Sequence, residues 1–150
     1  MKPNRTRAIA VALLLMLALT ACTDKNLRDI VNAAGKVADT VAVVQKATVD
    51  FETAGTLNRE QARAIMTLSI QISQANSRAM NIARDLSKLD EPSRQQLLTI
   101  LTPIIQAVDK GLTDQNILGI QNQQTRETIR ASLLAIQTSL NSINLILSAK

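Results

Sequence analysis

Apolar residues recur at alternating steps of three and four along almost the whole chain after residue 24. This spacing places them on one face of an α-helix, whereas a half-buried strand would alternate apolar and polar residues. No stretch shows that alternation with a turn dipeptide such as Asn-Gly, so the pattern predicts an all-α fold. The first such stripe, broken only by Thr48, comprises Leu27, Ile30, Ala34, Val37, Val41, Val44 and Phe51.

Helix-terminating residues divide the chain into four such segments. Gly55 is expected to end the first, because glycine readily adopts the left-handed conformation that closes helices. Asn58 with Gln61 predicts a capping box at the start of the second. Its expected core stripe contains only apolar residues: Ile65, Leu68, Ile72, Ala75, Ala79, Ile82, Leu86 and Leu89.

The third segment follows Asp90-Glu91-Pro92-Ser93, where Asp90 can cap and Pro92 fits a first helical turn. Pro103 lies inside it and cannot donate to the Thr99 carbonyl, which predicts a bend. Gly111 is expected to end this helix. Residues 112–121 predict either a short helical turn, which Thr113 or Asp114 could cap, or an irregular start to the last helix. The third and fourth stripes are Leu97, Leu98, Ile100, Leu101, Ile104, Ile105 and Val108, then Ile129, Leu133, Ile136, Leu140, Ile143 and Leu147.

Four helices joined by short connections predict an antiparallel up-down-up-down four-helix bundle, with the third helix bent at Pro103. The bundle would form a single domain over residues 22–150, and its core would be almost wholly aliphatic. Residues 23–150 resemble no family that we can identify.

The first 21 residues have the pattern of a cleaved targeting segment. Lys2, Arg5 and Arg7 precede an apolar run of 14 residues, Ala8 to Ala21, which is shorter than the roughly 20 residues of a membrane-spanning helix. The run ends in Leu19-Thr20-Ala21-Cys22, which resembles the lipobox of bacterial lipoproteins at every position. An uncleaved anchor helix, or a chance cysteine after an apolar run, is the alternative interpretation.

The resemblance implies that Cys22 carries diacylglycerol through a thioether, that cleavage falls between Ala21 and Cys22, and that the new amine is acylated. Two or three acyl chains would hold the protein to a membrane essentially permanently. The expected location is therefore the bacterial cell envelope, with the domain facing the periplasm. In enterobacterial lipoproteins, Asp directly after the cysteine favours the inner membrane; Thr23 stands there in this chain, which favours the outer membrane.

Composition argues against several classes of function. The chain has no His, Trp or Tyr and one Cys, so the commonest general base and the aromatic platforms that stack bases or sugars are missing. The three cations of the leader account for most of the formal net charge of +5, which argues against nucleic-acid binding. Carboxylates such as Asp50 with Glu52 fall at expected helix ends. We therefore predict no catalytic residue, no metal site and no cofactor.

Apolar residues outside the main stripes indicate a possible partner surface for an envelope protein or a second copy of the chain. They are Met66, Ile70, Met80, Leu134 and Leu145. The alternative is that they flank a broad core. The sequence thus predicts a lipid-anchored, non-enzymatic helical protein that acts by protein contact. Alternatives are a carrier of small apolar ligands or lipids with a cavity in the bundle, and a membrane-perturbing or phage-exclusion effector.

Overall fold

A computed structural model describes residues 24–149, and every regular element among them is an α-helix. The all-α prediction is therefore confirmed for this part of the chain. The predicted lipidation and cleavage residues, Ala21 and Cys22, lie outside the described residues. The helices are α2 (Lys25–Thr53), α3 (Arg59–Asp85), α4 (Glu91–Thr113), α5 (Gln115–Leu118) and α6 (Gln123–Ser148).

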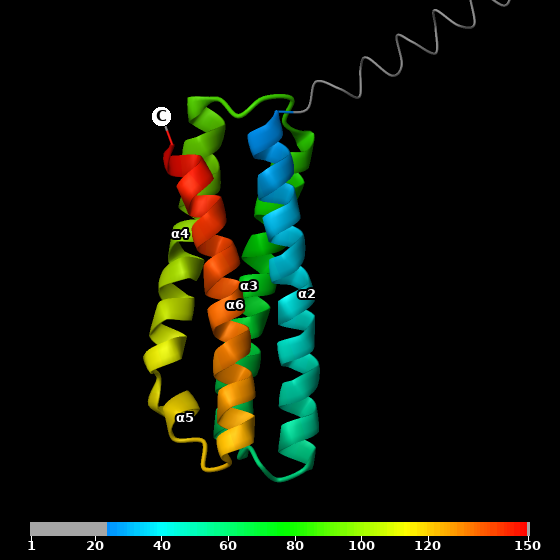
Figure 1. The fold of residues 1–150 in the computed structure, drawn as a ribbon, viewed down its shortest axis with the longest axis vertical. Coiled ribbons are helices and arrows are strands. Elements are labelled where there is room, and N and C mark those ends of the chain that lie inside the picture. The colour runs from blue at the N-terminus through cyan, green and yellow to red at the C-terminus, as the bar shows by residue number, and fades with distance from the viewer. Residues whose placement is uncertain (1–23, 150) are drawn as a thin grey trace, which may run out of the picture.

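The four long helices lie side by side along the longest axis of the molecule (Figure 1). α2 packs against α3 and α6, and α4 packs against the same two helices. Among the described residues, no Cα atom of α2 lies within 8 Å of a Cα atom of α4, and none of α3 lies within 8 Å of one of α6. The start of α2, the α3–α4 connection and the end of α6 share one end of the molecule, and α5 lies at the other (Figure 1).

Short polar side chains begin the helices as the sequence predicts. The Asn58 side chain accepts from the Gln61 amide at 2.9 Å, and the Gln61 side chain accepts from the Asn58 amide at 3.0 Å, which completes the capping box. Asp90 caps α4 by accepting from the Ser93 amide at 3.1 Å. After α2, Gly55 adopts a φ of 73°, in the left-handed region where a side chain would be strained.

The prediction that Gly111 ends the third helix is wrong. α4 continues to Thr113, and Gly111 is buried inside it. A Cβ atom at Gly111 would lie 2.6 Å from Cδ2 of Leu68 on α3, so this glycine admits a neighbouring side chain. The chain turns at Asp114, which accepts from the Asn116 amide and caps the single-turn helix α5. This short turn is the one predicted within residues 112–121.

The core follows a seven-residue repeat in α2 and α3, where buried positions recur at steps of three and four without drift. This repeat is the signature of helices that supercoil around one another. On α2 it selects the predicted residues, with Thr48 buried among them and Phe51 half-buried: Leu27, Ile30, Ala34, Val37, Val41, Val44 and Thr48. On α4 and α6 the predicted stripes also supply the buried apolar residues.

On α3 the predicted stripe is partly wrong. Leu68, Ala75 and Ile82 are half-buried at its edge, whereas the buried positions one residue further along the helix are Ser69, Asn76 and Ala83. The prediction chose the apolar residue at each level of the helix. The packed helices instead bury the positions that follow the seven-residue repeat. Two polar residues therefore lie in the centre of the interface. The complete buried set of α3 is Gln61, Ala62, Ile65, Ser69, Ile72, Asn76, Ala79 and Ala83.

Candidate functional site: a groove between α3 and α4

A hollow of about 590 Å³ lies on the outside of the molecule, where α3, α4 and α5 meet. Its volume falls within the range of about 300–1,000 Å³ that is typical of ligand sites. Its apolar lining comes from small and aliphatic side chains, and charged residues surround it. The lining residues are Glu60, Arg63, Ala64, Thr67, Leu68, Gln71, Ala107, Lys110, Gly111, Asp114 and Ile117.

The hollow exists because small residues line both helices. Ala64 on α3 and Ala107 with Gly111 on α4 leave space that larger side chains would fill. The half-buried Leu68 reaches across to Gly111 and separates the hollow from the core. At its lower end, Ile117 of α5 is buried and closes the floor.

A second hollow of about 360 Å³ continues along the same two helices and shares Gln71 and Ala107 with the first. Arg78, Pro103 and Ile104 contribute to its walls. Together the two hollows form one groove, which we call the α3–α4 groove. It extends from Glu60 to Arg78 along α3, roughly 27 Å at 1.5 Å per residue.

Both acids of the α3–α4 groove lie at helix N-termini, whereas its cations form no hydrogen bond or ion pair within residues 24–149. Glu60 lies in the first turn of α3, where the helix dipole favours a negative charge, and Asp114 caps α5. Lys46, Arg94 and Arg126 are the cationic residues whose side chains bond to other groups within residues 24–149. Arg63, Arg78 and Lys110 are exposed on the walls of the groove.

The predicted partner-surface residues are not brought together. Met66 and Met80 are half-buried on α3; Met66 lines a hollow with Thr48 of α2, and Met80 packs against the core. Ile70 on α3, and Leu134 with Leu145 on α6, are 44%, 46% and 72% exposed. Because α3 and α6 are not neighbours, the five residues do not form one patch.

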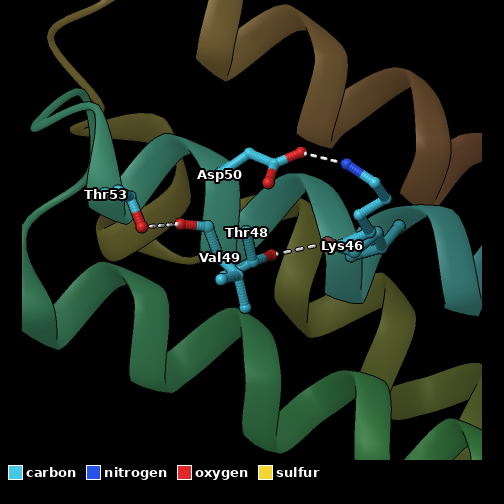
Figure 2. A network of polar contacts seen from close by, with 6 residues as sticks. Lys46, Thr48, Val49, Asp50 and Thr53 are labelled. Carbon is cyan, nitrogen blue, oxygen red and sulfur yellow. Dashed lines mark hydrogen bonds and ion pairs between the residues drawn. The ribbon is translucent and has the colours of Figure 1, made fainter.

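Polar residues inside the molecule bond mainly to their own helices. The hydroxyls of Thr48 and Ser69 donate to the carbonyls of Val44 and Ile65, at 2.7 and 2.8 Å. Figure 2 shows this region of α2, where Lys46 and Asp50 form an exposed ion pair at 2.6 Å and Thr53 donates to the Val49 carbonyl. These contacts lie within single helices.

The buried Asn76 bonds instead to a different helix. It is 1% exposed, and its Nδ2 atom donates to the Ala34 carbonyl of α2 at 2.9 Å. Its Oδ1 atom is buried without a hydrogen-bond partner. This amide therefore links α2 to α3 at a fixed level, and it leaves one unsatisfied acceptor in the core.

The acidic residues are dispersed over the surface and the helix ends. The neighbouring acids Asp50 with Glu52, and Asp90 with Glu91, are all exposed. Among residues 24–149, no three His, Cys, Asp or Glu side chains gather in an arrangement that could hold a metal ion. The pKa of the exposed Asp90 carboxyl lies below its ordinary value because the Ser93 side chain and amide donate to it.

α6 is the one described helix that is long and apolar enough, by length and composition, to cross a membrane. Seven of its residues are buried, and the helix packs against α2 and α4. Packing in the core accounts for much of this apolar character. Its hydropathy is thus weak evidence for a membrane span.

The α3–α4 groove was not predicted from the sequence, although one signal was present. Ala64, Ala75, Ala107 and Gly111 are small residues on two consecutive helices. Their common orientation depends on how α3 and α4 pack, which the periodicity of each helix does not specify. No family model, no curated protein and no solved structure matches this chain.

Proposed function

We propose that this protein is a lipid-anchored, non-enzymatic envelope protein that acts by contact with another protein. The observation that carries the proposal is the join between the lipobox-like sequence and the helical body. Asp24 stands two residues after Cys22 and caps α2, accepting from the Asn26 amide at 2.9 Å. Its second carboxylate oxygen accepts from the Leu89 amide, which ties this first turn to the α3–α4 connection.

This join would hold the body close to the lipid surface. Only Thr23 separates an acylated Cys22 from the Asp24 cap, and this step of two residues spans at most about 7 Å. The start of α2 would therefore face the membrane. The α5 end would lie roughly 40 Å further out if the long axis stands upright, since α2 has 29 residues.

The architecture that we propose for the body is the up-down-up-down four-helix bundle, with α5 in its last connection. The ring of contacts α2–α3, α3–α4, α4–α6 and α6–α2 supports it. α4 is one continuous helix that includes Pro103. The bend at this residue remains a prediction.

A role in protein contact is supported by what the surface offers. The described residues provide a groove with exposed cations, and Ile70, Leu134 and Leu145 are exposed apolar side chains. The acids are at helix ends or in solvent, where they have no reactive neighbour such as histidine. We infer that the protein contacts a partner protein in the periplasm. Thr23, which directly follows the cysteine, favours the outer membrane as the one that carries the anchor.

The anchor is tested by intact mass and membrane fractionation of the full chain expressed in a bacterium. We expect the wild-type protein to lose residues 1–21, to gain the mass of fatty acyl chains and to sediment with membranes. Cys22→Ser should remove the acyl mass, and Thr23→Ser is the matched control that should retain it. A wild-type protein that is released without acyl mass would contradict the proposal.

A further inference from the structure

The shape of the α3–α4 groove and the hydrogen bonding of its walls suit the binding of a helix. Its walls are two helices, whose backbone amides and carbonyls bond within each helix. It therefore offers no sheet edge to an extended peptide, whose own backbone groups would stay unpaired. An incoming helix satisfies its own backbone and needs only side-chain contacts from the groove.

Small residues let such a helix approach closely. Ala64, Ala75 and Ala107 line the floor, and Leu68 with Ile117 adds apolar surface. The length of roughly 27 Å corresponds to about 18 residues of helix, or five turns. The groove is open to solvent along its rim, so an occupant would bury one apolar face and keep the other exposed.

The charged residues of the groove favour an occupant that carries negative charge. Arg63, Arg78 and Lys110 lie along its walls without a bonded partner within the described residues. Glu60 and Asp114 line the same hollow as Arg63 and Lys110, but Glu60 lies in the first turn of α3 and Asp114 caps α5, so both acids already have a structural role. Acidic side chains on the flanks of the occupant would meet the three cations.

We propose that the α3–α4 groove binds an amphipathic helix of a partner protein, with a narrow apolar face and glutamate or aspartate on its flanks. The groove begins beside α5, and α5 lies at the end of the molecule remote from the start of α2 (Figure 1). The anchored end would thus hold the body, and the groove would lie along its side, open to the periplasm from the α5 end as far as Arg78. This inference rests on the proposed function and identifies the surface and the chemistry of the partner.

Two designed peptides of about 18 residues test the proposal on the full-length chain in lipid nanodiscs. Both carry the same apolar face with one Trp; one has Glu flanks and the other has Lys flanks. Because the chain contains no Trp or Tyr, it adds no such emission of its own, and the peptide Trp reports its burial once the emission of the empty nanodisc is subtracted. We expect the Glu peptide to bind at least about tenfold more tightly than the Lys peptide, with a blue-shifted emission.

Charge reversal distinguishes the groove from general attraction. Arg63→Glu with Lys110→Glu should invert the preference of the two peptides. Lys36→Glu with Arg130→Glu, both exposed and outside the groove, changes the net charge equally and should leave the preference unchanged. Ala107→Leu should fill the groove and abolish binding, whereas Ala42→Leu on the exposed face of α2 should not. Circular dichroism verifies that each variant is folded.

Equal binding of both peptides, an equal effect of the control pair, or no emission shift at the highest soluble peptide concentration would overturn the proposal. Acylation of Cys22 is measured separately by mass. An anchored protein that fails to discriminate the peptides would reject the groove and leave the anchor intact. A protein that binds the Glu peptide but carries no acyl chain would reject the anchor alone.

Discussion

Six polar residues are buried among the described residues, and three of them, Thr48, Ser69 and Asn76, are each only 1% exposed. The two hydroxyls donate to carbonyls four residues earlier in their own helices, so each is satisfied wherever its helix packs. The Asn76 amide instead donates across to the Ala34 carbonyl of α2. A single buried asparagine of this kind specifies helix register at a cost in stability.

Replacement of Asn76 by leucine should stabilise the protein. Asn76→Leu removes the buried Oδ1 atom that has no partner, and the free energy of unfolding should rise by about 1 kcal/mol. Asn76→Asp buries a charge and should lower it by about 3 kcal/mol. Urea denaturation followed by circular dichroism measures both, with the exposed Asn81→Leu as control. Destabilisation by Asn76→Leu would show that the cross-helix bond outweighs the orphaned oxygen.

Asp90 should make the stability depend on acid pH. Its pKa is lowered by hydrogen bonds from the Ser93 side chain and amide, so the folded state favours the carboxylate. This contribution is complete above the pKa of an unfolded aspartate, about 3.9, and is lost as the pH falls through the lower folded value. Asp90→Ala should therefore lower the urea midpoint at pH 7, and its difference from wild type should shrink below pH 4.

The control for this pH effect is Asp90→Asn. Asparagine is also a good N-cap, but it does not titrate, so its difference from wild type should be smaller at pH 7. A deficit of Asp90→Ala that stays constant from pH 7 to pH 3 would show that the carboxylate form is not what stabilises the start of α4.

At the scale of the single element, glycine has a different role in each of two helices. Gly35 lies inside α2, where an added Cβ would meet nothing within 4 Å. Gly111 lies inside α4, where the same atom would meet Leu68 Cδ2 at 2.6 Å. The first glycine only weakens its helix, whereas the second makes room for its neighbour. Local sequence alone does not distinguish them.

Alanine substitution should separate the two glycines. Gly35→Ala should raise the free energy of unfolding by about 0.5–1 kcal/mol, because alanine loses less backbone entropy in a helix. Gly111→Ala should gain less or become destabilising, since Leu68 has to move. In a Leu68→Ala background the gain at Gly111 should be restored. Chemical denaturation of the four proteins completes the cycle, and equal gains at both glycines would contradict the packing argument.

At the scale of the whole molecule, side chains tie elements that are distant in sequence. At one end Asp24 bonds to the Leu89 amide, and Arg94 at the start of α4 donates to three carbonyls at the end of α6. At the other end the hydroxyl of Thr125 donates to that of Thr56 at 3.0 Å. These contacts fix how the helix ends are arranged around the aliphatic core.

Loss of Arg94 should loosen the end of α6. Its Nη1 atom lies 3.0, 3.3 and 2.6 Å from the carbonyl oxygens of Ile146, Leu147 and Ala149. Arg94→Met should lower the free energy of unfolding by about 1–2 kcal/mol and speed amide hydrogen exchange in the last turn. Arg130→Met, on the exposed face of α6, is the matched control. Unchanged exchange in Arg94→Met would show that core packing alone holds this turn.

The sequence by itself determined the helices, most of their boundaries and the aliphatic stripes of α2, α4 and α6. The reason is that caps such as Asn58 with Gln61, and the spacing of apolar residues, act within one helix over a few residues. It also supplied the lipobox resemblance at Cys22, on which the proposed anchor rests.

Only the tertiary structure decided which face of α3 is buried, why Gly111 is needed and where a groove opens. Each of these depends on the partner helix: the repeat shared by packed helices placed Ser69 and Asn76 inside, and Leu68 occupied the space above Gly111. Small residues on α3 and α4 became a groove because the two helices present them to the same side. Packing between helices is a long-range property, and the periodicity of a single segment does not encode it.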